Sequence, residues 1–160
     1  MGVNRAQPYI YVLPEDDADR QLANSFHLEI DLIRQRQMQV LPVAGGWLHV
    51  LELFKSEHII KMEQNPNQIM VLLIDFDGQE GRLAKAKADI PDHLTDRVFV
   101  LGAWTRPEDL KPHFGSYDDI GKKLAKECRE ETDMAWEHNL LQHNKGELDR
   151  LREHVRPILF

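Results

Sequence analysis

Four short apolar runs divide the first two thirds of the chain, and polar segments separate them. The runs occupy residues 9–13, 40–43, 69–78 and 97–102 and are rich in β-branched or aromatic residues, which predicts four β-strands. The run at 69–78 is too apolar to have one face in water. We therefore expect it to form a central strand of a sheet that is covered on both faces.

The segments between these runs have helical periodicity. From Asp17 to about Gln37, apolar residues recur at spacings of four, four and three, which places them on one face of a helix. A segment starting at Trp47 predicts a second helix, and one starting at Arg82 predicts a short third helix that is followed by a loop. This alternation favours βαβ units, so we expect an α/β fold with a mainly parallel four-stranded sheet and helices on both faces.

The last third of the chain has a different pattern. It has no further β-rich run, and residues 117–135 and 136–156 have the pattern of two charged amphipathic helices. We expect an α/β domain over residues 1–105 and a C-terminal helical extension over residues 106–160, packed on the flank or edge of the same sheet.

The composition is that of one globular domain with a buried core. Of 160 residues, 42% are hydrophobic and 29% are charged. The formal net charge of -7 argues against binding of nucleic acid or an anionic membrane by overall attraction, although a local site remains open. No apolar run approaches the length of a bilayer span, so we expect no membrane association.

The cysteine and histidine residues suggest no metal site of their own. Cys128 is the single cysteine, which excludes an internal disulfide or a cysteine-based zinc cluster and fits a reducing compartment, with the cytoplasm as the expected location. The eight histidines are scattered, and none has the spacing of a known metal-binding motif.

Acidic residues follow two of the predicted strands. Glu15 comes one proline after the first strand, and Asp75 and Asp77 end the third, where strand alternation would put both aspartates on the same side. The carboxyl ends of parallel strands meet at one sheet edge, so the three carboxylates should lie together. Their repulsion would be relieved by Mg²⁺ or Mn²⁺, a cofactor suited to phosphodiester or phosphoryl chemistry.

With these acids in place, the order of motifs resembles a Toprim domain, as found in topoisomerases, bacterial primases, OLD-type nucleases and small maturation ribonucleases. The resemblance covers about residues 9–102 and rests on Glu15, the glycine pair Gly45-Gly46 and the Asp75-Phe-Asp77 motif. It implies that Glu15, Asp75 and Asp77 bind Mg²⁺ and catalyse phosphodiester cleavage, with Glu15 as candidate general base or acid. The target, whether DNA, RNA or a small nucleotide, stays open.

Smaller features near these motifs add to the resemblance or depart from it. Asp19 is the acid four residues after the glutamate that the family pattern contains. Asp16 stands where the family usually has glycine, Gln79 where some members have a third aspartate, and Gly81 one position later than the usual spacing.

Two features near the acids are candidates for contact with a phosphate. Arg82 is the stronger basic candidate, whereas Lys85 fits a solvated helix face better. The pair Gly45-Gly46 either lets the backbone approach a phosphate or only permits a tight turn.

Two other classes of function also fit parts of the sequence. The string LLIDFDG resembles the first motif of HAD-type phosphatases, in which Asp75 would be the nucleophile and Asp77 the general acid. Too little chain lies between Lys111 and Asp119 for the later motifs of that family, and Gln79 replaces its usual threonine. The other alternative is a non-catalytic Toprim-like scaffold.

Such a scaffold would bind a protein partner through its C-terminal helices. Leu141, Leu148 and Val155 are spaced by seven, which would also suit a homodimer seam, although core packing explains the spacing better.

Overall fold

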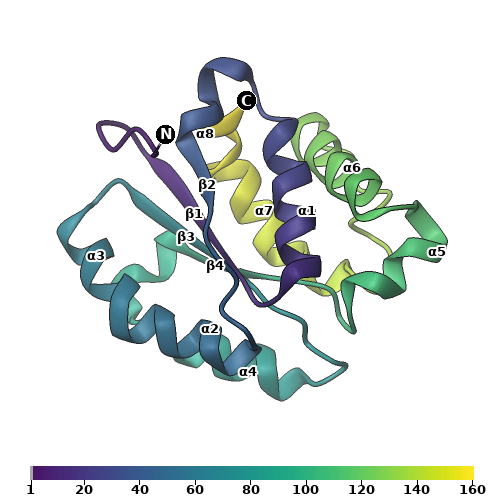
Figure 1. The fold of residues 1–160 in the computed structure, drawn as a ribbon, viewed down its shortest axis with the longest axis horizontal. Coiled ribbons are helices and arrows are strands. Elements are labelled where there is room, and N and C mark those ends of the chain that lie inside the picture. The colour runs from purple at the N-terminus through teal and green to yellow at the C-terminus, as the bar shows by residue number, and fades with distance from the viewer. Residues whose placement is uncertain (1) are drawn as a thin grey trace.

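The protein is an α/β structure built on four parallel strands. A computed structural model describes residues 2–160 and shows the sheet order β2-β1-β3-β4, with every neighbouring pair parallel (Figure 1). This confirms the predicted fold class. The strands are β1 (Tyr9–Pro14), β2 (Met38–Val40), β3 (Gln68–Leu73) and β4 (Val98–Leu101).

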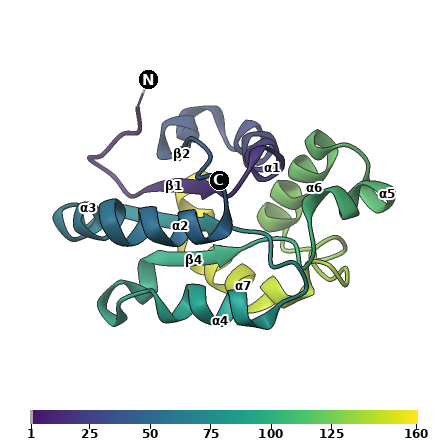
Figure 2. The same cartoon turned by 60° about the horizontal axis from the view of Figure 1, so that its bottom comes forward.

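Helices cover both faces of the sheet (Figure 1), and Figure 2 shows α2 running alongside the strands. One face carries α1 (Asp17–Leu28), α6 (Tyr117–Glu130), α7 (Lys145–His154) and α8 (Arg156–Leu159). The other carries α2 (Trp47–Leu53), α3 (Ile59–Gln64) and α4 (Glu80–Ala88), with a π-helical segment Phe54–His58 joining α2 to α3. The short helix α5 (Lys111–Phe114) precedes α6.

The core divides into two layers because side chains alternate along the central strands. Val12 and Val71 are buried against the α1 and α6 side, whereas Leu13 and Leu72 are buried against the α2 and α4 side. A strand that is buried on both faces carries apolar side chains at nearly every position. This explains the continuous apolar run that predicted the central strand.

Two predicted boundaries near the start of the chain were wrong. The first helix ends at Leu28 instead of Gln37, and residues 32–37 form a 3-10 segment in which Leu32 and Ile33 are each 89% exposed. The apolar spacing therefore continued into residues that do not face the core. Strand β2 covers 38–40 and ends before most of the predicted run.

The C-terminal extension also differs from two continuous helices. Helix α6 stops at Glu130, where Glu131 adopts a left-handed backbone conformation with φ 58. The Glu127 carboxylate then accepts the backbone N–H of Ala135 at 2.7 Å and folds the chain back, so that Trp136 becomes buried. Regular helix resumes only with α7.

The extension covers the edge of the sheet that β4 forms. The backbone N–H of Val100 in edge strand β4 donates to the Glu147 carboxylate of α7 at 2.9 Å, and Arg150 donates to the Val98 carbonyl. These contacts occupy groups that an uncovered edge strand would offer to another chain. Over residues 2–160, no helix combines the length and the apolar character needed to cross a bilayer.

A glycine allows α6 to approach α1 closely. A Cβ atom at Gly121 would lie 2.5 Å from Ser25 Cβ and 2.6 Å from the Leu22 carbonyl oxygen. Gly146 in α7 has no heavy atom within 4 Å of such a Cβ. Gly121 and Gly146 therefore form a matched pair of helical glycines.

We expect Gly121→Ala to lower the free energy of unfolding by about 2 kcal/mol or more, because α1 and α6 must separate. Gly146→Ala should raise it by about 0.5 kcal/mol through helix propensity. Urea denaturation measures both values. Equal effects of the two substitutions would contradict the close packing of α1 on α6.

Candidate metal centre

Glu15 is held where the loops after β1 and β2 meet. Its backbone N–H donates to the Leu73 carbonyl at 2.9 Å, and its own carbonyl accepts the N–H groups of Gly45 at 2.9 Å and Gly46 at 3.3 Å. Both glycines have positive φ, 89 and 145, which side chains disfavour. The pair therefore serves the tight turn that fixes Glu15, and its N–H groups are not free for a phosphate.

Asp75 lies just beyond the carboxyl end of β3. The pairing of Pro14 with Leu73 continues past both strands, and the backbone N–H of Asp75 donates to Glu15 Oε2 at 2.7 Å. Phe76 points to the opposite face and is fully buried there. The sheet order places β1 beside β3, where successive connections leave in opposite directions, and open α/β sheets bind ligands at such a point.

Asp19 completes the group from the first turn of α1. Asp16 is the N-cap and accepts the Asp19 backbone N–H at 3.1 Å, which starts the helix so that Asp19 faces the sheet. Its side chain is 0% exposed, and neither carboxylate oxygen accepts a hydrogen bond from an N–H or hydroxyl group. The Asp75 carboxyl lies close enough to share a proton with it. Glu15, Asp19 and Asp75 each contribute an oxygen, and these oxygens lie within 4.8 Å of one another.

Asp77, the third acid named by the sequence, is not a member of this group. Its backbone is left-handed with φ 51, which ends the strand alternation that would have kept it beside Asp75. The Asp77 side chain is 55% exposed, and its carboxylate lies 3.6 Å from Arg82 Nη2. The sequence therefore predicted that Glu15 and Asp75 lie together at the ends of two strands. It identified Asp19 only as a supporting residue.

Burial dominates the electrostatics of the three acids. Loss of water, together with the neighbouring Asp75 and Asp16 carboxylates, raises the pKa of Asp19 to about 11. Burial also raises the pKa of Asp75 to about 7. The pKa of Glu15 is raised by burial too, but the N–H of Asp75 and the charge of Arg82 oppose the rise. Without a cation, the group holds protons at neutral pH.

Arg82 is fixed beside the acids by three contacts. Its Nη1 donates to the Asp75 carbonyl at 3.0 Å, its guanidinium lies 4.9 Å from the centre of the Trp47 ring, and it pairs with Asp77. Its buried Nε has no partner. Lys85 instead pairs with Asp89 on an exposed helix face, as the solvated-face interpretation expected.

The remaining metal-ligating side chains do not form a second centre. His113 and His138 have ring centres 4.5 Å apart, whereas His143 contacts the Gly102 carbonyl at 2.7 Å. Among residues 2–160, only Glu15, Asp19 and Asp75 bring three potential ligand atoms this close together. The chemistry of the site is therefore that of oxygen ligands.

The raised pKa values imply a pH-dependent stability of the metal-free protein. An acid whose pKa is raised on folding holds its proton more tightly in the folded state, so stability falls as the pH rises above about 4, the ordinary pKa of aspartate. This fall continues through the Asp75 value of about 7 toward the Asp19 value of about 11. Asp19→Asn removes the largest contribution.

In metal-free buffer at pH 8, we expect Asp19→Asn to raise the free energy of unfolding by about 1–3 kcal/mol and to flatten its pH dependence. Asp17→Asn is the matched control, because Asp17 lies on the exposed side of the same helical turn and pairs with Arg20. It should change stability by about 0.5 kcal/mol or less. Chemical denaturation at several pH values measures this, and a destabilised Asp19→Asn protein would refute it.

Comparisons of the chain with protein-family models, curated proteins and solved structures find no match. The interpretation of the site therefore depends on the geometry of its residues.

Proposed function

We propose that Glu15, Asp19 and Asp75 bind one Mg²⁺ or Mn²⁺ ion and that the protein uses this site to cleave phosphodiester bonds in nucleic acid. One observation carries the proposal. Asp19 is fully buried with two unpartnered carboxylate oxygens, beside two further carboxylates. A carboxylate in such a position is costly unless a proton or a metal cation neutralises it, and one divalent cation can neutralise neighbouring carboxylates together.

The protein does not supply that charge from its own side chains. Within residues 2–160, none of the three carboxylates forms an ion pair, and Arg82 donates to the carbonyl of Asp75 instead of its carboxylate. All three available ligands are anionic oxygens, which suit hard cations such as Mg²⁺ and Mn²⁺. The absence of histidine and cysteine from the group speaks against zinc.

The surrounding residues favour phosphate as the group that meets the metal. A divalent ion bound here would neutralise charge on phosphate oxygens and activate water. Glu15 is half-buried and burial raises its pKa above the ordinary value, which makes it a stronger proton acceptor than an exposed carboxylate. Arg82 is a cation fixed beside the acids, and guanidinium groups bind phosphate oxygens well.

The choice of nucleic acid as substrate comes from the Toprim resemblance. The HAD-type alternative needs Asp75 and Asp77 to act on the same phosphoryl group, whereas Asp77 is exposed and paired with Arg82. The group of Glu15, Asp19 and Asp75 fits the Toprim pattern better, because that pattern contains the acid four residues after the glutamate. The non-catalytic scaffold would bind the metal without turnover.

The proposal is tested by metal titration calorimetry and by cleavage of labelled single-stranded and duplex DNA and RNA. We expect Asp19→Asn and Asp75→Asn each to weaken Mg²⁺ binding by about 10-fold or more, because each removes a charged ligand. Cleavage should fall by about 100-fold or more.

Asp77→Asn is the control, because the sequence predicted Asp77 as a metal ligand and the structure places Asp19 in the group instead. It should retain metal affinity within about 3-fold, because the Asp77 carboxylate pairs with Arg82 at the exposed rim. Loss of metal binding in Asp77→Asn, with binding kept in Asp19→Asn, would overturn the assignment. Metal binding without cleavage of any substrate would favour the non-catalytic scaffold over a nuclease. Phosphate release from a small monoester would favour the HAD-type alternative.

Arg82 should act on the substrate more than on the metal. We expect Arg82→Gln to raise KM for a nucleic acid substrate by about 10-fold or more, because a charge-assisted hydrogen bond to phosphate is lost. Affinity for Mg²⁺ should change by less than about 3-fold, since Arg82 does not contact a carboxylate of the group. Steady-state kinetics and calorimetry measure the two effects. A change in Mg²⁺ affinity with an unchanged KM would contradict this role.

A further inference from the structure

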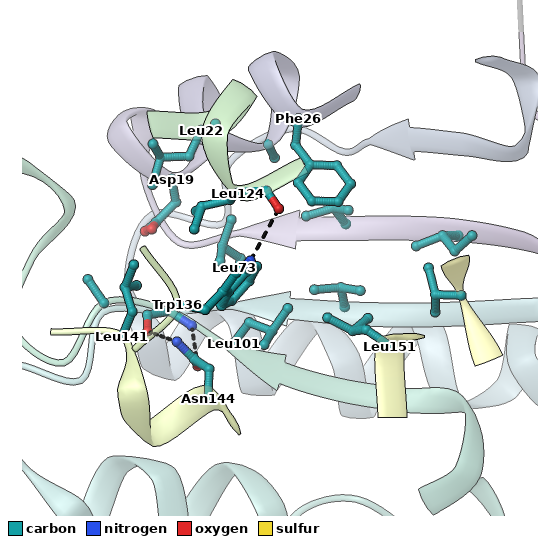
Figure 3. Close-up of a pocket in the computed structure, with 18 of the residues that line it drawn as sticks. Asp19, Leu22, Phe26, Leu73, Leu101, Leu124, Trp136, Leu141, Asn144 and Leu151 are labelled. Carbon is teal, nitrogen blue, oxygen red and sulfur yellow. Dashed lines mark hydrogen bonds between the residues drawn. The ribbon is translucent and has the colours of Figure 1, made fainter. Parts of the chain in front are cut away.

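A cavity of about 110 Å³ lies between the sheet and the helices of the α1 face. The inner wall is formed by strand residues such as Val12 and Val71, and the outer wall by residues such as Leu22 and Leu124 of α1 and α6. Figure 3 shows Trp136 in the middle of the lining and Asp19 at one end. The cavity thus begins at the buried acid and extends away from the metal centre.

Almost all of the surface that faces the cavity is apolar. The polar groups of Asn144 are both used, because its side chain accepts the Gly102 N–H at 3.3 Å and donates to the Gly102 carbonyl at 3.0 Å (Figure 3). The indole N–H of Trp136 donates to the Leu124 carbonyl at 3.2 Å. Among the side chains that line the cavity, Asp19 alone keeps unpartnered buried oxygens.

A water molecule would be poorly held in this space. Buried waters typically make two to four hydrogen bonds, and cavities without such partners stay dry. The Asp19 carboxylate could accept a hydrogen bond only from a water at one end of the cavity. The other polar groups of the lining already have hydrogen-bond partners. The interior therefore favours an apolar occupant over solvent.

We propose that this cavity is a binding site for a small, uncharged molecule made mostly of hydrocarbon and about the size of benzene. An apolar cavity of about 150 Å³ in another protein is known to bind benzene and xenon, and the volume here is of the same order. Such a ligand restores the dispersion contacts that an empty cavity lacks. Any single polar atom of the ligand would lie at the Asp19 end.

One part of the wall suits entry of a ligand. Trp136 and Leu141 come from the irregular segment between α6 and α7, whereas most of the lining lies on strands and helices. Local opening occurs preferentially in segments of low regular structure. Transient opening of residues 131–141 would expose the cavity without separating α1 from the sheet.

The test uses the full-length protein in buffer with a metal chelator, so that it does not depend on the proposed metal site. Benzene is the probe, and pyrazine is a control of the same shape with two polar nitrogens. We expect benzene at several times its Kd to raise the melting temperature by about 2–4 °C in a saturable manner. Pyrazine at the same concentration should give less than half of that shift.

Two variants show whether the cavity itself binds the probe. Val71→Phe places a larger side chain in the cavity and should abolish the benzene effect, whereas Val43→Phe, at a residue that is 43% exposed, should keep it. If Val71→Phe does not fold, the same comparison is made with Ala23→Leu, which also fills the cavity. No saturable benzene effect in the wild type, or an equal effect in the cavity-filling variant, would overturn the proposal.

Discussion

The burial of three carboxylates at one edge of the sheet is the constraint on which the rest of this structure depends. Glu15 and Asp75 reach that edge because β1 and β3 are adjacent and parallel, and the hydrogen bond from the Asp75 N–H to Glu15 locks the two strand ends together. Asp19 joins them because Asp16 caps α1 at the position that turns this residue inward. Three like charges in so little space are tolerable only when protons or a cation neutralise them.

Several features remote from the acids serve the same arrangement. The glycine pair Gly45-Gly46 binds the carbonyl of Glu15, so it positions the site without offering groups to a ligand. Gly121 lets α6 pack closely on α1, the helix that carries Asp19. The C-terminal extension therefore protects the β4 edge of the sheet and packs on α1, although it supplies no member of the acidic group.

The sequence predicted the parallel sheet, its covered faces and the meeting of Glu15 with Asp75. These follow from periodicity and from the geometry of parallel strands, which are both visible in the order of residues. It could not show that Asp77 leaves the group, because that depends on a single left-handed residue after the strand. It named Asp19 only as a supporting residue, since which acid of a first helical turn faces inward depends on where the cap lies.

The central claim is that Asp19, and not Asp77, completes a metal site with Glu15 and Asp75. Anomalous diffraction from crystals grown with saturating Mn²⁺ tests it most directly. A single ion bound by the three residues would give one strong peak within bonding distance of a carboxylate oxygen from each of them. A peak ligated by Asp75 and Asp77 without Asp19, or no peak near Asp75 at all, would contradict it.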